Sequence, residues 1–277
     1  MPSNSEAVLK RLANEALRVR RNVWRALHAA SAGHVGGSTS AADLLAALYF
    51  YYLNLRPEQP DWPDRDRFVL SKGHANAALV AVLAQAGFFP DSHLDEFYGY
   101  RTLMGMHPDI KLGGVEMSTG GLGHGLSVGV GMALGGRLQK RGFRTVVMLG
   151  DGELQEGSNW EAAMSAAHLK LADLTAIVDY NKIQQSGHVQ DVLGLEPLAD
   201  KWRAFGWSVR ELDGHDMAQI TAALDALPFA PDRPSLMIAH TVKGKGVSFA
   251  EDTHLWHQNT VGDEIYRKAL DELGEPL

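Results

Sequence analysis

The sequence contains no cysteine, which excludes disulfide bonds and thiolate chemistry. It also lacks an apolar run long enough to cross a membrane, because the longest, LLAALYFYYLNL, is only as long as a buried helix. The opening stretch MPSNSEAVLKRLANEALRVRR has no continuous apolar core, so no secretory signal is recognised. We therefore expect a cytoplasmic protein.

An excess of positive charge is also missing. The formal net charge is −7 over 277 residues, which argues against a nucleic-acid-binding protein. Basic residues do cluster near the N-terminus, and we interpret them as a solvated helix face or one that meets an acidic partner surface: Lys10, Arg11, Arg18, Arg20, Arg21 and Arg25. The hydrophobic fraction of 45% and the charged fraction of 21% are typical of a globular domain.

The N-terminal part of the chain is predicted to be mainly helical. Apolar residues recur at steps of three and four over residues 8–27, which is typical of one buried helix face. Ser40 followed by Asp43 resembles a capping box that opens a second, almost wholly apolar helix. A strand at 67–71 and a helix at 74–87 are expected next.

Residues 89–122 show little periodicity, and a long loop of this kind inside a compact domain is usually functional. Beyond it, helices are predicted at 123–140, 157–170, 197–205, 215–226 and 261–273, and strands at 145–150, 174–180, 207–212 and 235–240. Alternation of helices with solidly apolar strands predicts an α/β fold with a parallel sheet covered by helices on both faces. No repeat or linker interrupts residues 1–277, so we expect a single domain.

The stretch RTVVMLGDGELQEGSNW places Asp151 between two glycines at the end of a predicted strand. Asn181 follows the next strand about 30 residues later, which is the length of one βαβ unit. Both should lie at the carboxyl edge of the sheet, where open parallel sheets bind ligands. Their oxygens suit Mg²⁺ or Ca²⁺, and the flanking glycines suit a diphosphate. A plain helix N-cap role for Asp151 is equally open.

Other nucleotide-binding signatures are not found. The chain has no GxxxxGK[ST] motif, and the glycine-rich TGGLGHGLSVGVGMALGG fails the dinucleotide pattern in its register. Histidines instead recur at predicted junctions, as His34, His74, His107, His254 and His257. One such histidine usually serves as a cap or hydrogen-bond partner, but five of them beside glycines weaken that interpretation. His254 and His257 lack a third ligand with zinc spacing.

Six motifs together resemble the N-terminal half of transketolase over nearly the full length of the chain. They are GHVGGSTSAADLLAALY, DRDRFVLSKGHANAALVAVLAQAGFF, GMHPD, STGGLGHGLSVGVGMALGGR, GDG with Asn181, and TVKGKGVSF. The resemblance implies a thiamine diphosphate-binding fold that also binds a divalent metal, Mg²⁺, Ca²⁺ or Mn²⁺. It further implies a transferase that moves a two-carbon ketol unit between sugar phosphates.

The resemblance also implies roles for individual residues. Asp151 and Asn181 would hold the metal by their side chains, and Ile183 by its backbone carbonyl. The cofactor would be contacted by His74, Gly120, Leu122, Gly152, Asn181 and His257. The donor sugar would meet His34, His107 and His257, and Glu156 would support the catalytic acid of a partner domain at a subunit interface.

The pyrimidine-binding domain of the family is not found in the sequence and is expected on a separate chain, as in split transketolases. The chain should then be inactive alone and assemble with that partner, most simply as a heterotetramer. The family motif after His257 is replaced by Gln258, Asn259, Thr260 and Val261, which leaves the sugar substrates open. The alternatives are a related two-carbon transferase or synthase with a non-standard acceptor, and a non-catalytic cofactor-binding homologue.

Overall fold

The computed structural model describes residues 5–274, and within them it forms one sheet of five parallel strands. The strand order is β1-β2-β3-β5-β4, so the sheet has the parallel arrangement that the sequence predicts. The strands are β1 (Arg67–Leu70), β2 (Thr145–Gly150), β3 (Leu174–Tyr180), β4 (Ser208–Asp213) and β5 (Ser235–His240).

The central strands are buried on both sides, and their side chains alternate between two hydrophobic cores. In β2, Val146 and Met148 belong to one core, whereas Val147 and Leu149 belong to the other. Successive side chains of a strand point to opposite faces, so a strand covered on both faces must be apolar at every position. This explains the uninterrupted apolar runs that identified these strands in the sequence.

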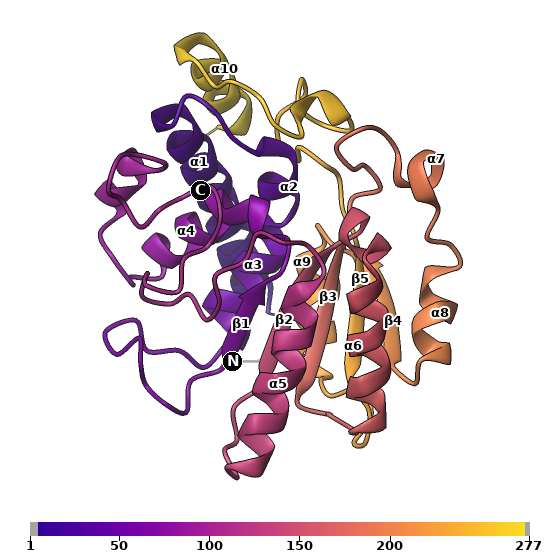
Figure 1. The fold of residues 1–277 in the computed structure, drawn as a ribbon. Helices are drawn as coiled ribbons and strands as arrows, with labels where there is room; N and C mark the ends of the chain where they lie inside the picture. The colour runs from indigo at the N-terminus through magenta and orange to yellow at the C-terminus, as the bar shows by residue number, and fades with distance from the viewer. Residues whose placement is uncertain (1–4, 275–277) are drawn as a thin grey trace.

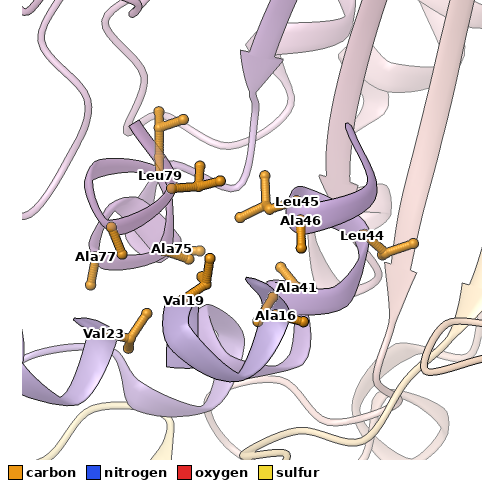
Figure 2. Close-up of a cluster of buried hydrophobic side chains, with 14 of the residues drawn as sticks. Ala16, Val19, Val23, Ala41, Leu44, Leu45, Ala46, Ala75, Ala77 and Leu79 are labelled. Atoms are coloured by element: carbon orange, nitrogen blue, oxygen red, sulfur yellow. The ribbon is translucent and has the colours of Figure 1, made fainter. Parts of the chain in front are cut away.

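The first core lies between the sheet and a group of mostly N-terminal helices. Figure 2 shows how Val19 of α1, Leu45 of α3 and Leu79 of α4 lie in one cluster. The helices of this side are α1 (Glu6–Ala29), α2 (Val35–Ser40), α3 (Ala42–Ala47), α4 (Asn76–Gln85) and α9 (Met217–Asp225).

The second core lies under the opposite face, which α5 and α6 cross in Figure 1. Its helices are α5 (His124–Leu138), α6 (Gly157–His168), α7 (Val189–Leu193) and α8 (Leu198–Ala204), while α10 (Asp263–Leu273) packs against the first core. Helices therefore cover both faces, as predicted. None of the helices in residues 5–274 is both long and apolar enough to span a membrane.

Two local predictions in the N-terminal part were wrong. Ser40 does not cap a helix, because it ends α2 and its hydroxyl donates to the Asp179 carboxylate at 2.6 Å. Asp43 instead forms a buried ion pair with Arg20, so Arg20 is not on a solvated basic face. The predicted apolar helix after Ser40 consists of α3 and a π-helical turn at Leu48–Tyr52, and α2 precedes it. The causes are partners distant in sequence, which local patterns do not encode.

Candidate active site

A cavity of about 370 Å³ opens at the carboxyl ends of β2 and β3. Its wall includes every site residue predicted from the sequence except His107, namely His34, His74, Gly120, Leu122, Asp151, Gly152, Glu156, Asn181, Ile183 and His257. These residues come from segments spread over most of the chain, and the sheet brings them together at one edge.

Asp151 follows β2 directly and is almost completely buried, with 3% exposure. Its carboxylate accepts hydrogen bonds from the backbone N–H groups of Gly152, at 2.7 Å, and of Lys182. It therefore caps the short 3-10 helix Gly152–Gln155 and lines the cavity as well. Burial, followed by the charge of Asp179, raises the pKa of Asp151 to about 6.

Asn181 stands at the end of the neighbouring strand, because β2 and β3 pair directly with Gly150 opposite Asp179. Both residues therefore lie at the carboxyl edge of the sheet, as predicted, and on neighbouring strands. The side-chain oxygen of Asn181 accepts from the Ile183 N–H at 3.2 Å. A carboxylate, an amide oxygen and a backbone carbonyl form a hard donor set that fits Mg²⁺ or Ca²⁺. Within residues 5–274, no group of three or more His, Cys, Asp or Glu side chains is arranged to hold a metal ion.

A buried ion pair beneath the cavity was not predicted. The Lys72 ammonium donates to the carboxylate of Asp179 and, at 2.8 Å, to the Gly37 carbonyl. Burial alone would raise the pKa of Asp179, but Lys72 and the hydroxyls of Ser40 and Thr241 outweigh it and hold that pKa below its ordinary value. Asp179 is therefore an anion that keeps the Lys72 ammonium at the cavity wall.

Lys243 is a second buried cation in the cavity wall, with 2% exposure. Its ammonium donates to the Ile183 carbonyl at 2.7 Å and lies 2.9 Å from Nδ1 of His257. Burial lowers the pKa of Lys243 to about 8, so the side chain is mostly charged at neutral pH. The sequence signal for both lysines was their place beside glycine in SKGHA and TVKGKG, just after strands.

His34, His74 and His257 form a triangle of imidazoles in which each pair of ring centroids is 5.3 Å apart. Burial, with His107 and Lys243 nearby, lowers the pKa of His34 to about 4. Burial and Lys243 lower the pKa of His257 to about 3, and burial and Lys72 lower the pKa of His74 well below its usual value. All three rings are thus neutral at physiological pH and carry one donor and one acceptor nitrogen each.

His107 and Glu156 occupy the exposed margin of this site. His107 is not part of the cavity wall, but its ring lies against Gly120, where an added Cβ would meet the His107 Cδ2 atom at 3.4 Å. Glu156 precedes α6 and lines the cavity from an exposed position. Both residues are therefore accessible to solvent at the cavity margin.

Glu153 is a further buried carboxylate that sequence analysis missed. It accepts the N–H groups of Gly123 and Gly150, each at 2.9 Å, and the hydroxyl of Ser71. Burial raises the pKa of Glu153 above its ordinary value. By joining three segments that surround the cavity, Glu153 fixes the glycine-rich turns in place.

The comparison with protein families matches this chain over residues 11–275 to the transketolase, thiamine diphosphate binding domain. The chain belongs to the transketolase family. The match confirms the family, the α/β fold class, the transketolase-type enzyme class and the cofactor that the sequence motifs implied.

Curated relatives of similar length are similar to this transketolase-family chain along most of their sequences. One subunit of the apulose-4-phosphate transketolase of Phocaeicola vulgatus is 41% identical over 258 residues, which cover 93% of this chain and 92% of the relative. The 6-deoxy-6-sulfo-D-fructose transketolase subunit SqwG of Clostridium sp. strain MSTE9 is 45% identical over 242 residues, covering 87% and 88%.

Solved transketolases share the fold but are longer. The transketolase of Campylobacter jejuni matches with a TM-score of 0.89 and 31% identity, over 96% of this chain and 43% of that one. The transketolase of Leishmania mexicana matches with a TM-score of 0.89 and 29% identity, over 96% and 41%. This chain therefore spans about two fifths of the length of these solved transketolases.

Proposed function

We propose that this chain is the cofactor-holding subunit of a two-chain transketolase that moves a two-carbon ketol unit between sugar phosphates. The observation that carries the proposal is the composition of one cavity. Hard oxygen ligands, buried ammonium groups and neutral imidazoles line the same wall at the carboxyl edge of the sheet.

The residues at the base of the cavity fit thiamine diphosphate and a divalent metal. Asp151 and Asn181 would hold the metal by their side chains. Ile183 would hold it by the second lone pair of its carbonyl, because the Lys243 ammonium already donates to that oxygen. Lys72 and Lys243 would balance the negative charge of a diphosphate. An Ala at position 152 would place its Cβ 3.1 Å from the Cβ of Gln184, so glycine lets the turn after β2 lie close to the Gln184 side chain in the cavity wall. When bound, thiamine diphosphate supplies the electron sink that cleavage of a carbon–carbon bond beside a carbonyl needs.

The histidines would act on the sugar. A neutral imidazole can donate to a hydroxyl and accept from another without adding net charge to the site. Nδ1 of His34 is buried and has no hydrogen-bond partner in the described structure, so it is free to accept a bond from a ligand. We assign His34, His107 and His257 to the donor sugar. We assign His74 and the backbone of Gly120 and Leu122 to the cofactor.

The partner would be a second polypeptide with a pyrimidine-binding domain. Both relatives of this length are named as subunits of a transketolase, and the chain covers 92% and 88% of them. Glu156 lies exposed on the cavity margin, where it would support an acid supplied by that partner. The simplest assembly is a heterotetramer in the cytoplasm.

One observation favours a sugar outside the usual pentose phosphates as a second candidate. The two relatives are named for different substrates, apulose-4-phosphate and 6-deoxy-6-sulfo-D-fructose. In this chain, Asn259 pairs with Gly33 through backbone hydrogen bonds of 3.0 and 3.1 Å. The non-standard segment after His257 is thereby held next to His34, where it would touch the substrate.

Titration calorimetry with thiamine diphosphate tests cofactor binding directly. We expect heat of binding when Mg²⁺ is present and its loss when a chelator removes the metal, because the diphosphate would be held mainly through the ion. Thiamine without the diphosphate is the matched control and should bind far more weakly. If neither the chain nor its mixture with a pyrimidine-domain partner binds the cofactor, the chain is a non-catalytic homologue and the proposal fails.

A further inference from the structure

Lys243 connects two parts of the site that the sequence separates. On one side its ammonium donates to the Ile183 carbonyl at 2.7 Å, in the loop after β3. On the other side it lies 2.9 Å from Nδ1 of His257, beyond β5. An ammonium group has three donors and no acceptor, so the nitrogen that it meets on the imidazole has to be an acceptor.

The geometry points to Lys243 as a positioning residue that fixes the tautomer of His257, with the ring proton held on Nε2. Since Nδ1 accepts from the lysine, the other ring nitrogen of the neutral imidazole must carry the hydrogen. His257 then presents a fixed N–H donor, whereas an unconstrained imidazole exchanges between its two neutral forms. The tautomer of His257 does not depend on the proposed function, but the expected effect on turnover does.

The position of the lysine is itself constrained by the fold. A Cβ added at Gly36 in α2 would meet the Lys243 side chain at 2.7 Å, at Cγ, and at 2.8 Å, at Cε. The side chain therefore packs directly against a bare glycine backbone, and the Gly244 N–H donates to the Gly36 carbonyl at 3.1 Å. With 2% exposure, the Lys243 side chain is almost completely buried.

A defined tautomer matters because three neutral rings meet here. His34 and His74 lie with their centroids 5.3 Å from that of His257, and none of them adds charge at neutral pH. In such a group, the direction of each hydrogen bond depends on which nitrogen carries the proton. A donor fixed at Nε2 of His257 suits a substrate oxygen that gains negative charge during bond cleavage.

Nitrogen NMR of the isolated chain, labelled at its histidine rings, measures the tautomer without any need for turnover. The His257 signals are assigned by their loss in His257→Gln. We expect the wild-type ring at neutral pH to be a single form with the proton on Nε2 and Nδ1 in a hydrogen bond. A wild-type ring protonated on Nδ1 overturns the inference.

Lys243→Met removes the donor but keeps an unbranched side chain of similar length. We expect the Nδ1 signal of His257 to lose its hydrogen-bonded shift and the ring to exchange between both tautomers. Gly36→Ala displaces the lysine without removing its charge, and it should move the same signal in the same direction. If Lys243→Met folds poorly, Gly36→Ala alone still tests the contact between Lys243 and His257. An unchanged His257 spectrum in both variants overturns the inference.

Lys245→Met is the matched control, because Lys245 lies two residues away and pairs with Glu251 at 3.4 Å, not with His257. It should leave the ring signals unchanged. In the reconstituted enzyme with saturating cofactor, Lys243→Met should lower kcat by about 10²-fold, the typical effect of a misdirected proton-transfer or donor group. An unchanged kcat in Lys243→Met would show that Lys243 does not position His257 for turnover. An inactive wild-type mixture would instead count against the proposed function.

Discussion

At the scale of single residues, Asp151 combines a capping role with a place in the cavity wall. The sequence left open whether this carboxylate caps a helix or holds a metal. In the structure it accepts two backbone N–H groups and lines the cavity. A capping carboxylate normally lies at the surface, and burial of this one to 3% exposure raises its pKa to about 6. Capping alone does not require such a burial.

Asp151→Ala separates these roles. Because an N-cap is worth about 1 kcal/mol, we expect a small loss in the free energy of unfolding. Loss of an anionic metal ligand should weaken metal-dependent thiamine diphosphate binding by about 10-fold to 100-fold. This is the loss of affinity seen when a group that supports a metal ligand is removed. Urea denaturation and titration calorimetry measure the two effects.

Asp216→Ala is the control, because Asp216 caps α9 by accepting from Ala218 and Gln219 but lies outside the cavity wall. It should lose similar stability and keep its cofactor affinity. If Asp151→Ala unfolds readily while its affinity is unchanged, Asp151 is only a cap.

At the scale of elements, α5 carries glycine both where close packing requires it and where it does not. A Cβ on Gly129 would come within 2.4 Å of the Val147 side chain, so this glycine lets the helix approach β2 closely. Gly131, two residues on, is exposed and meets nothing within 4 Å. The sequence shows a uniform glycine-rich helix, and only the packing distinguishes its two faces.

The pair Gly129→Ala and Gly131→Ala tests this distinction on the isolated chain. Alanine at 131 should raise the free energy of unfolding by about 0.5–1 kcal/mol, because glycine is costly in a helix interior. Alanine at 129 should lower it by about 1–3 kcal/mol, because the added methyl group overpacks the core. Equal effects of the two substitutions in urea denaturation would show that α5 does not pack as described.

At the scale of the whole molecule, the cavity has an exposed margin. The sheet gathers oxygen donors, ammonium groups and imidazoles on one wall, while Glu156 and His107 are exposed at the margin. The solved transketolase of Campylobacter jejuni is matched over only 43% of its chain, and its fold includes more than this domain. A second polypeptide that closes the cavity is the arrangement that we propose.

Reconstitution tests that assembly. We expect no ketol transfer from this chain with thiamine diphosphate and Mg²⁺, and measurable transfer once a chain with a pyrimidine-binding domain is added. The added chain alone is the control and should also be inactive, since the metal ligands lie on the chain described here. Transfer by the isolated chain would contradict the proposed division of labour.

Much of the site was predictable because its residues stand at strand ends. Asp151 and Asn181 follow apolar strands, and glycines flank Asp151, whereas Ile183 was named only because of the resemblance to transketolase. Lys72, Lys243 and Glu153 were missed, since a charged residue near a loop gives no sign of burial until its partners are known. The same holds for Ser40 and Asp43, whose hydrogen-bond partners come from distant segments.

The sequence by itself determined the alternation of strands and helices, the parallel sheet and the family, because apolar runs and glycine motifs are local signals. Only the tertiary structure decided which ionisable groups are buried and what they meet. Burial and contact set the low pKa of the three imidazoles and placed the Lys243 ammonium between Ile183 and His257. Desolvation and short-range hydrogen bonds depend on neighbours in space, and those neighbours lie far apart along the chain.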